Sequence, residues 1–174
     1  GNIITRAYYH NLGGGIEDAV ISAPGPNESF RDFSDSKFIR RVPWFAINNM
    51  SPIFNASGAV LLESGINSAS ATPYLSFTSY YNPIDKKIYL YFTNKSGESA
   101  KVPGSAVDGK ALSPNALASA QIVSGGSLFA GNGYNSFDST GTKDRITNTT
   151  ITNQPIDSIS IPGYSFGYIS FLKP

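Results

Sequence analysis

Tyrosines recur at alternate positions in two consecutive segments of the chain. Tyr89 and Tyr91 alternate with apolar residues in one segment, and Tyr74 and Tyr80 lie in the segment before it. Alternate side chains of a strand share a face, so we expect Tyr74, Tyr89 and Tyr91 on one face of a hairpin, with Tyr80 near its turn. Tyrosine rings stack on the C–H face of a sugar while polar neighbours bind its hydroxyls, so this face predicts a glycan-binding platform. Because tyrosine is also a strong strand former, a face covered by another part of the protein is the alternative.

Two further aromatic residues are candidates for ligand binding. Tyr134 lies in the Gly- and Asn-rich stretch 131–142, which is typical of a loop. Trp44, the single tryptophan, lies among apolar residues, which favour a role as an anchor of the core or of an interface over sugar stacking. The candidate binding residues are therefore Tyr74, Tyr80, Tyr89, Tyr91, Tyr134 and Trp44.

No catalytic constellation is evident in the sequence. The single histidine, His10, lies beside a glycine run and has no partner motif, and neither GxSxG, HExxH nor a phosphate loop occurs. Glycosidases need two carboxylates across a sugar ring. Glu17, Asp18 and Glu63 lie in or beside predicted strands, where acids usually face solvent. We therefore expect that the chain is not itself an enzyme.

The sequence evidence for a metal or cofactor site is equally weak. The chain contains no cysteine, which excludes disulfides and thiolate metal sites. Oxygen-bearing residues gather at Asn132, Asn135, Asp138 and Asp144, but their spacing is not that of an EF-hand, so an ordinary polar loop is favoured. We expect no cofactor and keep a structural calcium ion as the alternative.

The charge balance excludes several classes of partner. Charged residues make up 14% of the 174 residues, and the 13 Lys and Arg residues nearly balance the 12 Asp and Glu residues. A chain with this balance has no strong positive electrostatic potential that would attract nucleic acid or an acidic membrane surface. No run of 18 or more apolar residues and no basic-then-apolar leader occurs, so the sequence predicts neither a membrane span nor an export signal of its own.

Short alternating segments separated by Gly, Pro and Asn indicate an all-β chain. The clearest pair is a hairpin whose apolar positions Leu75, Phe77, Ile88, Leu90 and Phe92 should face the core. Further strands are expected within residues 2–9, 17–22, 58–64, 98–103, 120–125, 145–152, 157–162 and 164–172. We predict one domain over residues 1–174, an antiparallel β-sandwich of jelly-roll-like form.

At most one short helix is expected, near residues 35–42. Asp35 or Ser36 would cap it, and Pro43 should end it near Arg41 because proline disrupts a helix interior.

From Pro73 onward the sequence resembles the β-sandwich that accompanies the catalytic barrel of clan-A glycoside hydrolases of the arabinofuranosidase, xylosidase and agarase groups. The resemblance rests on KKIYLYFTNKSGESAKV, on AQIVSGGSLFAGNGYN and on the closing SISIPGYSFGYISFL. It implies an accessory module of a carbohydrate-active enzyme, and no catalytic residue is transferred with it. Residues 1–60 do not follow the pattern.

The resemblance and the tyrosines together predict a secreted, non-catalytic module that binds a polysaccharide or oligosaccharide, or that supports a catalytic domain of the same polypeptide. Two alternatives remain. The same Gly, Asn, Ser and Tyr usage is expected of a viral fibre head or surface adhesin, which would trimerise. A small glycan-cleaving enzyme would need a cleft with two close carboxylates.

Overall fold

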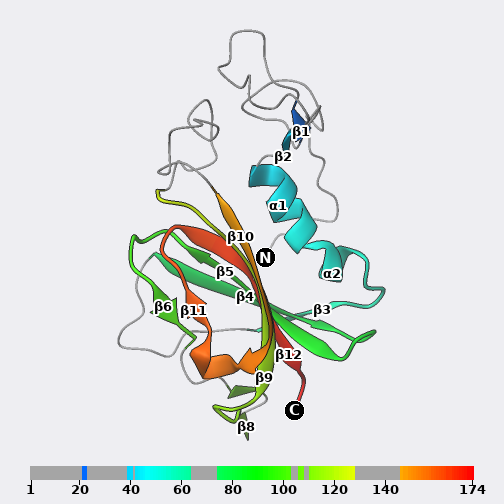
Figure 1. The fold of residues 1–174 in the computed structure, drawn as a ribbon. Coiled ribbons are helices and arrows are strands. Elements are labelled where there is room, and N and C mark those ends of the chain that lie inside the picture. The colour runs from blue at the N-terminus through cyan, green and yellow to red at the C-terminus, as the bar shows by residue number, and fades with distance from the viewer. Residues whose placement is uncertain are drawn as a thin grey trace, which may run out of the picture.

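A computed structural model describes residues 21–22, 39–40, 42–63, 74–102, 106–107, 110–127 and 146–174. Its centre is a six-stranded sheet in which every neighbouring pair is antiparallel (Figure 1). The strands, in spatial order, are β10 (Thr147–Pro155), β9 (Leu117–Ser124), β12 (Ser165–Leu172), β5 (Lys87–Asn94), β4 (Leu75–Asn82) and β3 (Val60–Leu62).

Three two-stranded pairs and three short helices complete the described part. β1 (Ile21–Ser22) pairs with β2 (Ile39–Arg40), β6 (Ala100–Lys101) with β11 (Ser160–Ile161), and β7 (Ala106–Val107) with β8 (Lys110–Ala111). The helices are α1 (Val42–Asn49), α2 (Ser51–Phe54) and the 3-10 helix η2 (Ile156–Ser158).

The predicted hairpin is confirmed as β4 and β5, which pair along their whole length. Asn82 ends the first strand, and its side-chain oxygen accepts a 2.9 Å hydrogen bond from the Ile84 backbone N–H, the local turn that Asn favours. Lys86 has a φ of 58° and closes the turn. A second asparagine, Asn94, ends β5 and organises the following turn through Ser96.

One face of the sheet carries the hydrophobic core. Ile88 and Phe92 of β5 are each 3% exposed, and Leu75, Phe77 and Leu90 pack against the same cluster, as predicted. Apolar residues from outside the sheet, including Ile156, Ile159, Ile161 and Val102, belong to this cluster. In Figure 1, η2, β11 and β6 lie across this side of the sheet. The all-β, sandwich-like fold class is confirmed, with a much smaller second layer than the first.

Close contact between the middle strands requires a glycine. A Cβ atom at Gly167 of β12 would collide with the backbone oxygen of Gln121 in β9. Because backbone in a central strand cannot move aside cheaply, only glycine fits this position.

The helix lies further along the chain than predicted. Residues 39–40 form strand β2, and α1 begins at Val42, so Pro43 occupies the first turn instead of ending the helix. Proline is tolerated there because the N–H that it lacks would have no partner within the helix. A four-residue helix, α2, follows directly and also has a proline, Pro52, in its first turn.

Candidate functional site: the tyrosine face of the sheet

The face of the sheet opposite the core carries four packed tyrosines, Tyr80, Tyr89, Tyr91 and Tyr168, which we call the tyrosine cluster. Tyr91 stands opposite Tyr168 in the pairing of β5 with β12, and Tyr80 stands opposite Tyr89 in the pairing of β4 with β5. Ring centroids are 5.3 Å apart for Tyr89 and Tyr168, 5.7 Å for Tyr91 and Tyr168, and 5.9 Å for Tyr80 and Tyr91. Edge-on and tilted contacts at these distances are the favourable aromatic geometries.

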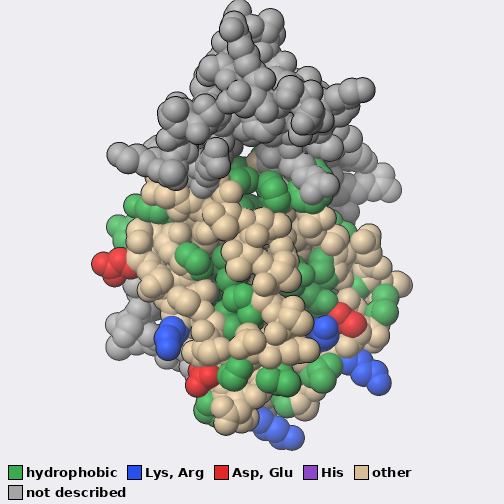
Figure 2. Space-filling model, viewed as in Figure 1, with side chains coloured by type: hydrophobic (Ala, Val, Ile, Leu, Met, Phe, Trp, Pro, Cys, Tyr) green, Lys and Arg blue, Asp and Glu red, His purple; other side chains and the backbone are tan. Residues whose placement is uncertain are grey.

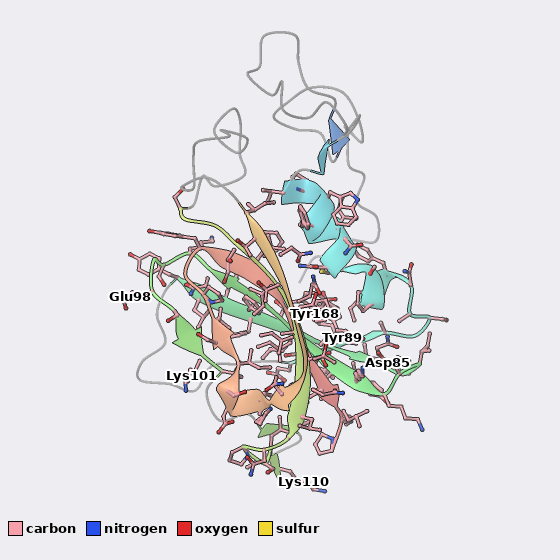
Figure 3. All side chains as sticks on the ribbon, in the orientation of Figure 1. Asp85, Tyr89, Glu98, Lys101, Lys110 and Tyr168 are labelled. Atoms are coloured by element: carbon pink, nitrogen blue, oxygen red, sulfur yellow. The ribbon has the colours of Figure 1, made fainter. Side chains whose placement is uncertain are left out.

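A carboxylate anchors one end of this cluster. The Tyr89 hydroxyl donates a 2.5 Å hydrogen bond to Asp85, which lies in the turn between β4 and β5. Figure 3 shows Asp85, Tyr89 and Tyr168 gathered at one place on the sheet. Burial, then the hydrogen bond to Asp85, raises the pKa of Tyr89. Burial also raises the pKa values of Tyr91 and Tyr168, so these hydroxyls remain neutral donors.

The two α-helices are held to this region by side-chain hydrogen bonds. The Tyr91 hydroxyl donates to the backbone oxygen of Asn49, the last residue of α1, at 3.0 Å. The Asn82 side-chain amide donates to the backbone oxygen of Pro52 in α2, also at 3.0 Å. Helix α1 therefore covers part of the face on which the tyrosines stand.

A pocket of about 200 Å³ lies between α1 and the sheet. Its floor combines hydroxyl side chains with aromatic rings, and its roof is the C-terminal end of α1. The lining includes Ser76, Thr78, Thr93, Tyr91, Phe166 and Asn49, and none of the described residues that line it is charged. A second hollow of about 140 Å³ shares Thr93 and Phe166 with the first and is also lined by Lys95 and Tyr164.

The predicted binding residues occupy different environments. Tyr80, Tyr89 and Tyr91 come together in the cluster, whereas Tyr74 directly precedes β4 and is 57% exposed. Tyr89 is only 7% exposed, so it offers little ring surface. Trp44 is half-buried on α1 and meets Phe45 edge-on at 5.0 Å. Tyr134 lies outside the described residues, and a binding role for any of the six stays a prediction.

Sequence reasoning missed Tyr168 and Phe166 as members of this face. Both lie in the closing strand, where Phe166, Tyr168 and Ser170 alternate with Gly167 and Ile169. That alternation could have placed them on one face, but only the pairing of β12 with β5 brings them beside Tyr91.

The described acids give no glycosidase pair on the central hairpin. Asp85 precedes β5 and Glu98 follows it, and a strand of eight residues spans roughly 27 Å. A sugar-cleaving pair needs at most about 9.5 Å. Figure 3 shows these two residues far apart, beyond opposite ends of β5. Glu63 is exposed just after β3, while His10, Glu17 and Asp18 lie outside the described residues.

Charged side chains and potential metal ligands are sparse among the described residues. Figure 2 shows a face of mixed polar and apolar side chains with only scattered Lys, Arg, Asp and Glu. Within the described ranges, no three His, Asp or Glu side chains lie close enough to hold a metal ion. The stretch with Asn132, Asn135, Asp138 and Asp144, for which a polar loop was favoured and a calcium ion kept as the alternative, falls outside those ranges. Among the described helices, none has the length and apolar character needed to cross a membrane.

Several solved structures are distant, partial matches to this chain. No family model matches the chain, and no curated protein matches it. Among solved structures, it is similar over 87% of its length to 31% of a GH51 alpha-L-arabinofuranosidase from Thermotoga petrophila RKU-1, at 17% identity and a TM-score of 0.42. It is also similar over 74% of its length to 27% of a GH30 endoxylanase from Clostridium papyrosolvens C71, at 10% identity and a TM-score of 0.39.

An endo-beta1,6-glucanase is a third such neighbour, with 94% of this chain matched to 25% of that one at 13% identity and a TM-score of 0.40. The chain spans less than a third of the length of each of these three glycoside hydrolases.

Proposed function

We propose that this chain is a non-catalytic β-sandwich module of an extracellular polysaccharide-degrading enzyme, which binds glycan through aromatic side chains or supports the catalytic domain. The observation that supports it best is the combination of rings and hydroxyls around the pocket beneath α1. Tyr91 and Phe166 present apolar surface there, and Ser76, Thr78 and Thr93 present groups that both donate and accept hydrogen bonds.

Neutral polar chemistry of this kind suits a neutral glycan. Sugar C–H groups pack on aromatic rings, and sugar hydroxyls exchange hydrogen bonds with serine and threonine. The tyrosine hydroxyls, whose pKa values are raised, stay protonated and contribute no negative charge. An uncharged ligand therefore fits this surface better than a phosphate or a carboxylate.

Exposed apolar side chains favour the second role, in which the chain supports a catalytic domain. Phe54, Val60 and Leu61 are 68%, 52% and 62% exposed, and they lie on α2 and the edge strand β3. An edge strand and an adjoining helix that expose apolar side chains offer surface for a protein contact. In this role the surface packs against the catalytic domain of the same polypeptide.

Affinity electrophoresis tests the binding role. The purified chain is run through gels that contain agarose, xylan, arabinan, β-glucans or alginate. We expect selective retardation in one gel and its loss in Phe166→Ala, while Ile84→Ala, which removes an exposed apolar side chain in the β4–β5 turn, keeps it. Unchanged mobility in every gel overturns the binding role and leaves the supporting role.

The oligomeric state separates this proposal from the adhesin alternative. Light scattering after size exclusion is expected to give a monomer. A stable trimer would favour a fibre head or adhesin instead.

A further inference from the structure

Three neutral polar side chains are hydrogen-bonded to one another beside an edge of the central sheet. The Gln121 amide nitrogen, on β9, donates a 2.6 Å hydrogen bond to Oδ1 of Asn148. The Gln121 Oε1 accepts a 2.9 Å hydrogen bond from the Thr150 hydroxyl. Asn148 and Thr150 belong to β10, the last strand on this side of the sheet, and both are exposed. We call these three residues the Gln121 network.

The Gln121 network lies in line with the tyrosine cluster. Gln121 stands opposite Thr150 in the pairing of β9 with β10, and opposite Tyr168 in the pairing of β9 with β12. Tyr168 stands opposite Tyr91, and Tyr91 stands opposite Thr78. Because directly opposite residues share a face of the sheet, these five side chains form one row across five strands. At roughly 4.8 Å between neighbouring strands, the row is about 19 Å long.

The row keeps polar groups that the protein itself does not use. The hydroxyls of Tyr89 and Tyr91 donate to other parts of the protein, whereas the Tyr168 hydroxyl makes no hydrogen bond within the described residues. Solvent reaches it, because Asn49 Nδ2 is the side-chain atom of the described residues that is both fully buried and unpaired. Gln121 also uses only one of its two amide N–H groups within the network.

The Gln121 network orders surface side chains that would otherwise be free to move. Holding long polar side chains in one rotamer loses conformational entropy, and the net gain from each neutral hydrogen bond is modest because water competes for the same groups. A ligand that meets side chains already held in place loses less entropy on binding. The network is therefore suited to recognition at the surface.

The chemistry of the row suits a neutral glycan. None of its five side chains is charged. Tyrosine rings accept the C–H face of a sugar, and the neighbouring amide and hydroxyl groups both donate and accept hydrogen bonds, as sugar hydroxyls do.

Both ends of the row are accessible, so a chain can continue beyond it. Thr150 is exposed at the sheet edge, and Thr78 is exposed at the other end, where it lines the hollow beneath α1 together with Tyr91. We infer that a neutral polysaccharide lies across the strands along this row and is bound through internal sugar units, with Gln121 and Tyr168 as specificity-determining residues. This inference rests on the proposed carbohydrate function and adds the path of the glycan chain.

Titration of the ¹⁵N-labelled full chain with oligosaccharides tests the inference. The probes are xylohexaose, arabinohexaose, cellohexaose and laminarihexaose, each with its monosaccharide as the length control. We expect one hexasaccharide to shift the amide signals of Gln121, Thr150 and Tyr168 saturably, and its monosaccharide to bind at least about tenfold more weakly. Reducing the end of that hexasaccharide to the alditol should leave its affinity unchanged, because internal units make the contacts.

Two neighbouring threonines of β10 provide a matched pair of variants. Thr150→Val removes the hydroxyl of the Gln121 network and should weaken binding about fivefold. Thr149→Val makes the same change on the opposite face of the strand, at another exposed position, and should leave binding unchanged. Valine suits a strand, so both variants should fold. Gln121→Leu, which removes the amide at similar size, should weaken binding about tenfold.

Several outcomes would overturn the inference. Equal affinities of the two threonine variants would mean that the network only ties β10 to β9. Monosaccharides that bind as tightly as the hexasaccharides would remove the extended path. Shifts that leave Gln121 and Thr150 unmoved, or no response to any of the four hexasaccharides, would also overturn it. If Gln121→Leu does not give a dispersed spectrum, the threonine pair decides the result.

The two proposals fail separately in the polysaccharide gels. Retardation of the parent chain that survives Gln121→Leu would overturn this path for the glycan and leave the binding module intact. Unchanged mobility of the parent chain in every gel would overturn the proposed binding role itself.

Discussion

The two faces of the central sheet are closed in different ways. On the core face, Ile169 and Phe171 of β12 are 0% and 5% exposed and lie in one apolar cluster with Ile159 and Ile161. On the opposite face, β12 contributes Tyr168, whose ring packs on other tyrosines. The first face is filled with aliphatic and phenylalanine side chains, while the second combines amphipathic rings, polar partners and a hollow.

The difference teaches how one sheet can serve both stability and recognition. Aliphatic burial is non-directional and fills space completely. Tyrosine gives comparable apolar contact but keeps a hydroxyl that needs a hydrogen-bond partner. On this face the tyrosine hydroxyls donate to Asp85 and to the backbone at the end of α1. A face built this way can retain space and donors for a ligand.

Ile169→Ala should cause the largest effect. Truncating this fully buried side chain removes apolar contacts and leaves a cavity, so the free energy of unfolding should fall by about 2–5 kcal/mol. Urea denaturation measures it. The adjacent variant Tyr168→Ala, on the half-buried face, is the comparison, and an equal or larger loss there would refute the distinction between the faces.

Asn94→Leu should destabilise the chain by about 2–3 kcal/mol. The substitution leaves the backbone oxygens of Glu98 and Pro162 without their side-chain donor and removes the acceptor of Ser96. Thermal unfolding followed by circular dichroism provides the measurement. A stability equal to that of the parent chain would mean that solvent replaces these bonds without cost.

Asn49→Leu should act in the opposite direction. Because the Asn49 amide nitrogen is buried and unpaired, replacing it with a methyl group should raise the free energy of unfolding by about 1 kcal/mol in the absence of ligand. The same urea titration measures the change. A loss of stability as large as that of Asn94→Leu would contradict the description of this amide as unpartnered.

Alkaline pH should destabilise the chain through the tyrosine face, with no change in stability at neutral pH. Since the folded pKa values of Tyr89, Tyr91 and Tyr168 are raised above the ordinary value of 10.0, folding favours their neutral forms. Their contribution to stability is complete below pH 10 and is lost as the pH rises above it, because the unfolded chain releases these protons first. Tyrosinate absorbance and unfolding midpoints between pH 9 and about 12 follow the effect.

The Tyr89→Phe variant tests whether Tyr89 is one of the groups that cause the loss of stability at alkaline pH. Tyr89→Phe cannot ionise and loses the bond to Asp85, so it should reduce the slope of stability against pH in the alkaline range. An unchanged slope would assign the alkaline sensitivity to other groups.

Much of the hairpin could be read from the sequence. Period-2 alternation placed Ile88, Leu90 and Phe92 on one face and Tyr89 and Tyr91 on the other, and the structure agrees. Asn82 and Asn94, a residue type that favours turns, lie at the ends of these two strands and each accepts a backbone hydrogen bond in the following turn. These features depend on neighbours within a few residues, which the sequence displays directly.

The rest of the site depended on contacts between distant segments. Nothing local to Tyr168 indicates that β12 inserts between β5 and β9, and nothing local to Val42 indicates that α1 lies over Tyr91. The short helix was expected earlier in the chain because Pro43 was interpreted as its end, whereas proline also suits a helix start.

The sequence by itself determined which side chains share a face of each strand, because the alternation of a β-strand is a property of its own backbone. Only the tertiary structure decided which face is closed by apolar packing and which retains a pocket. That choice depends on strand order and on where α1 docks, and both are set by the summed burial of residues far apart in the chain.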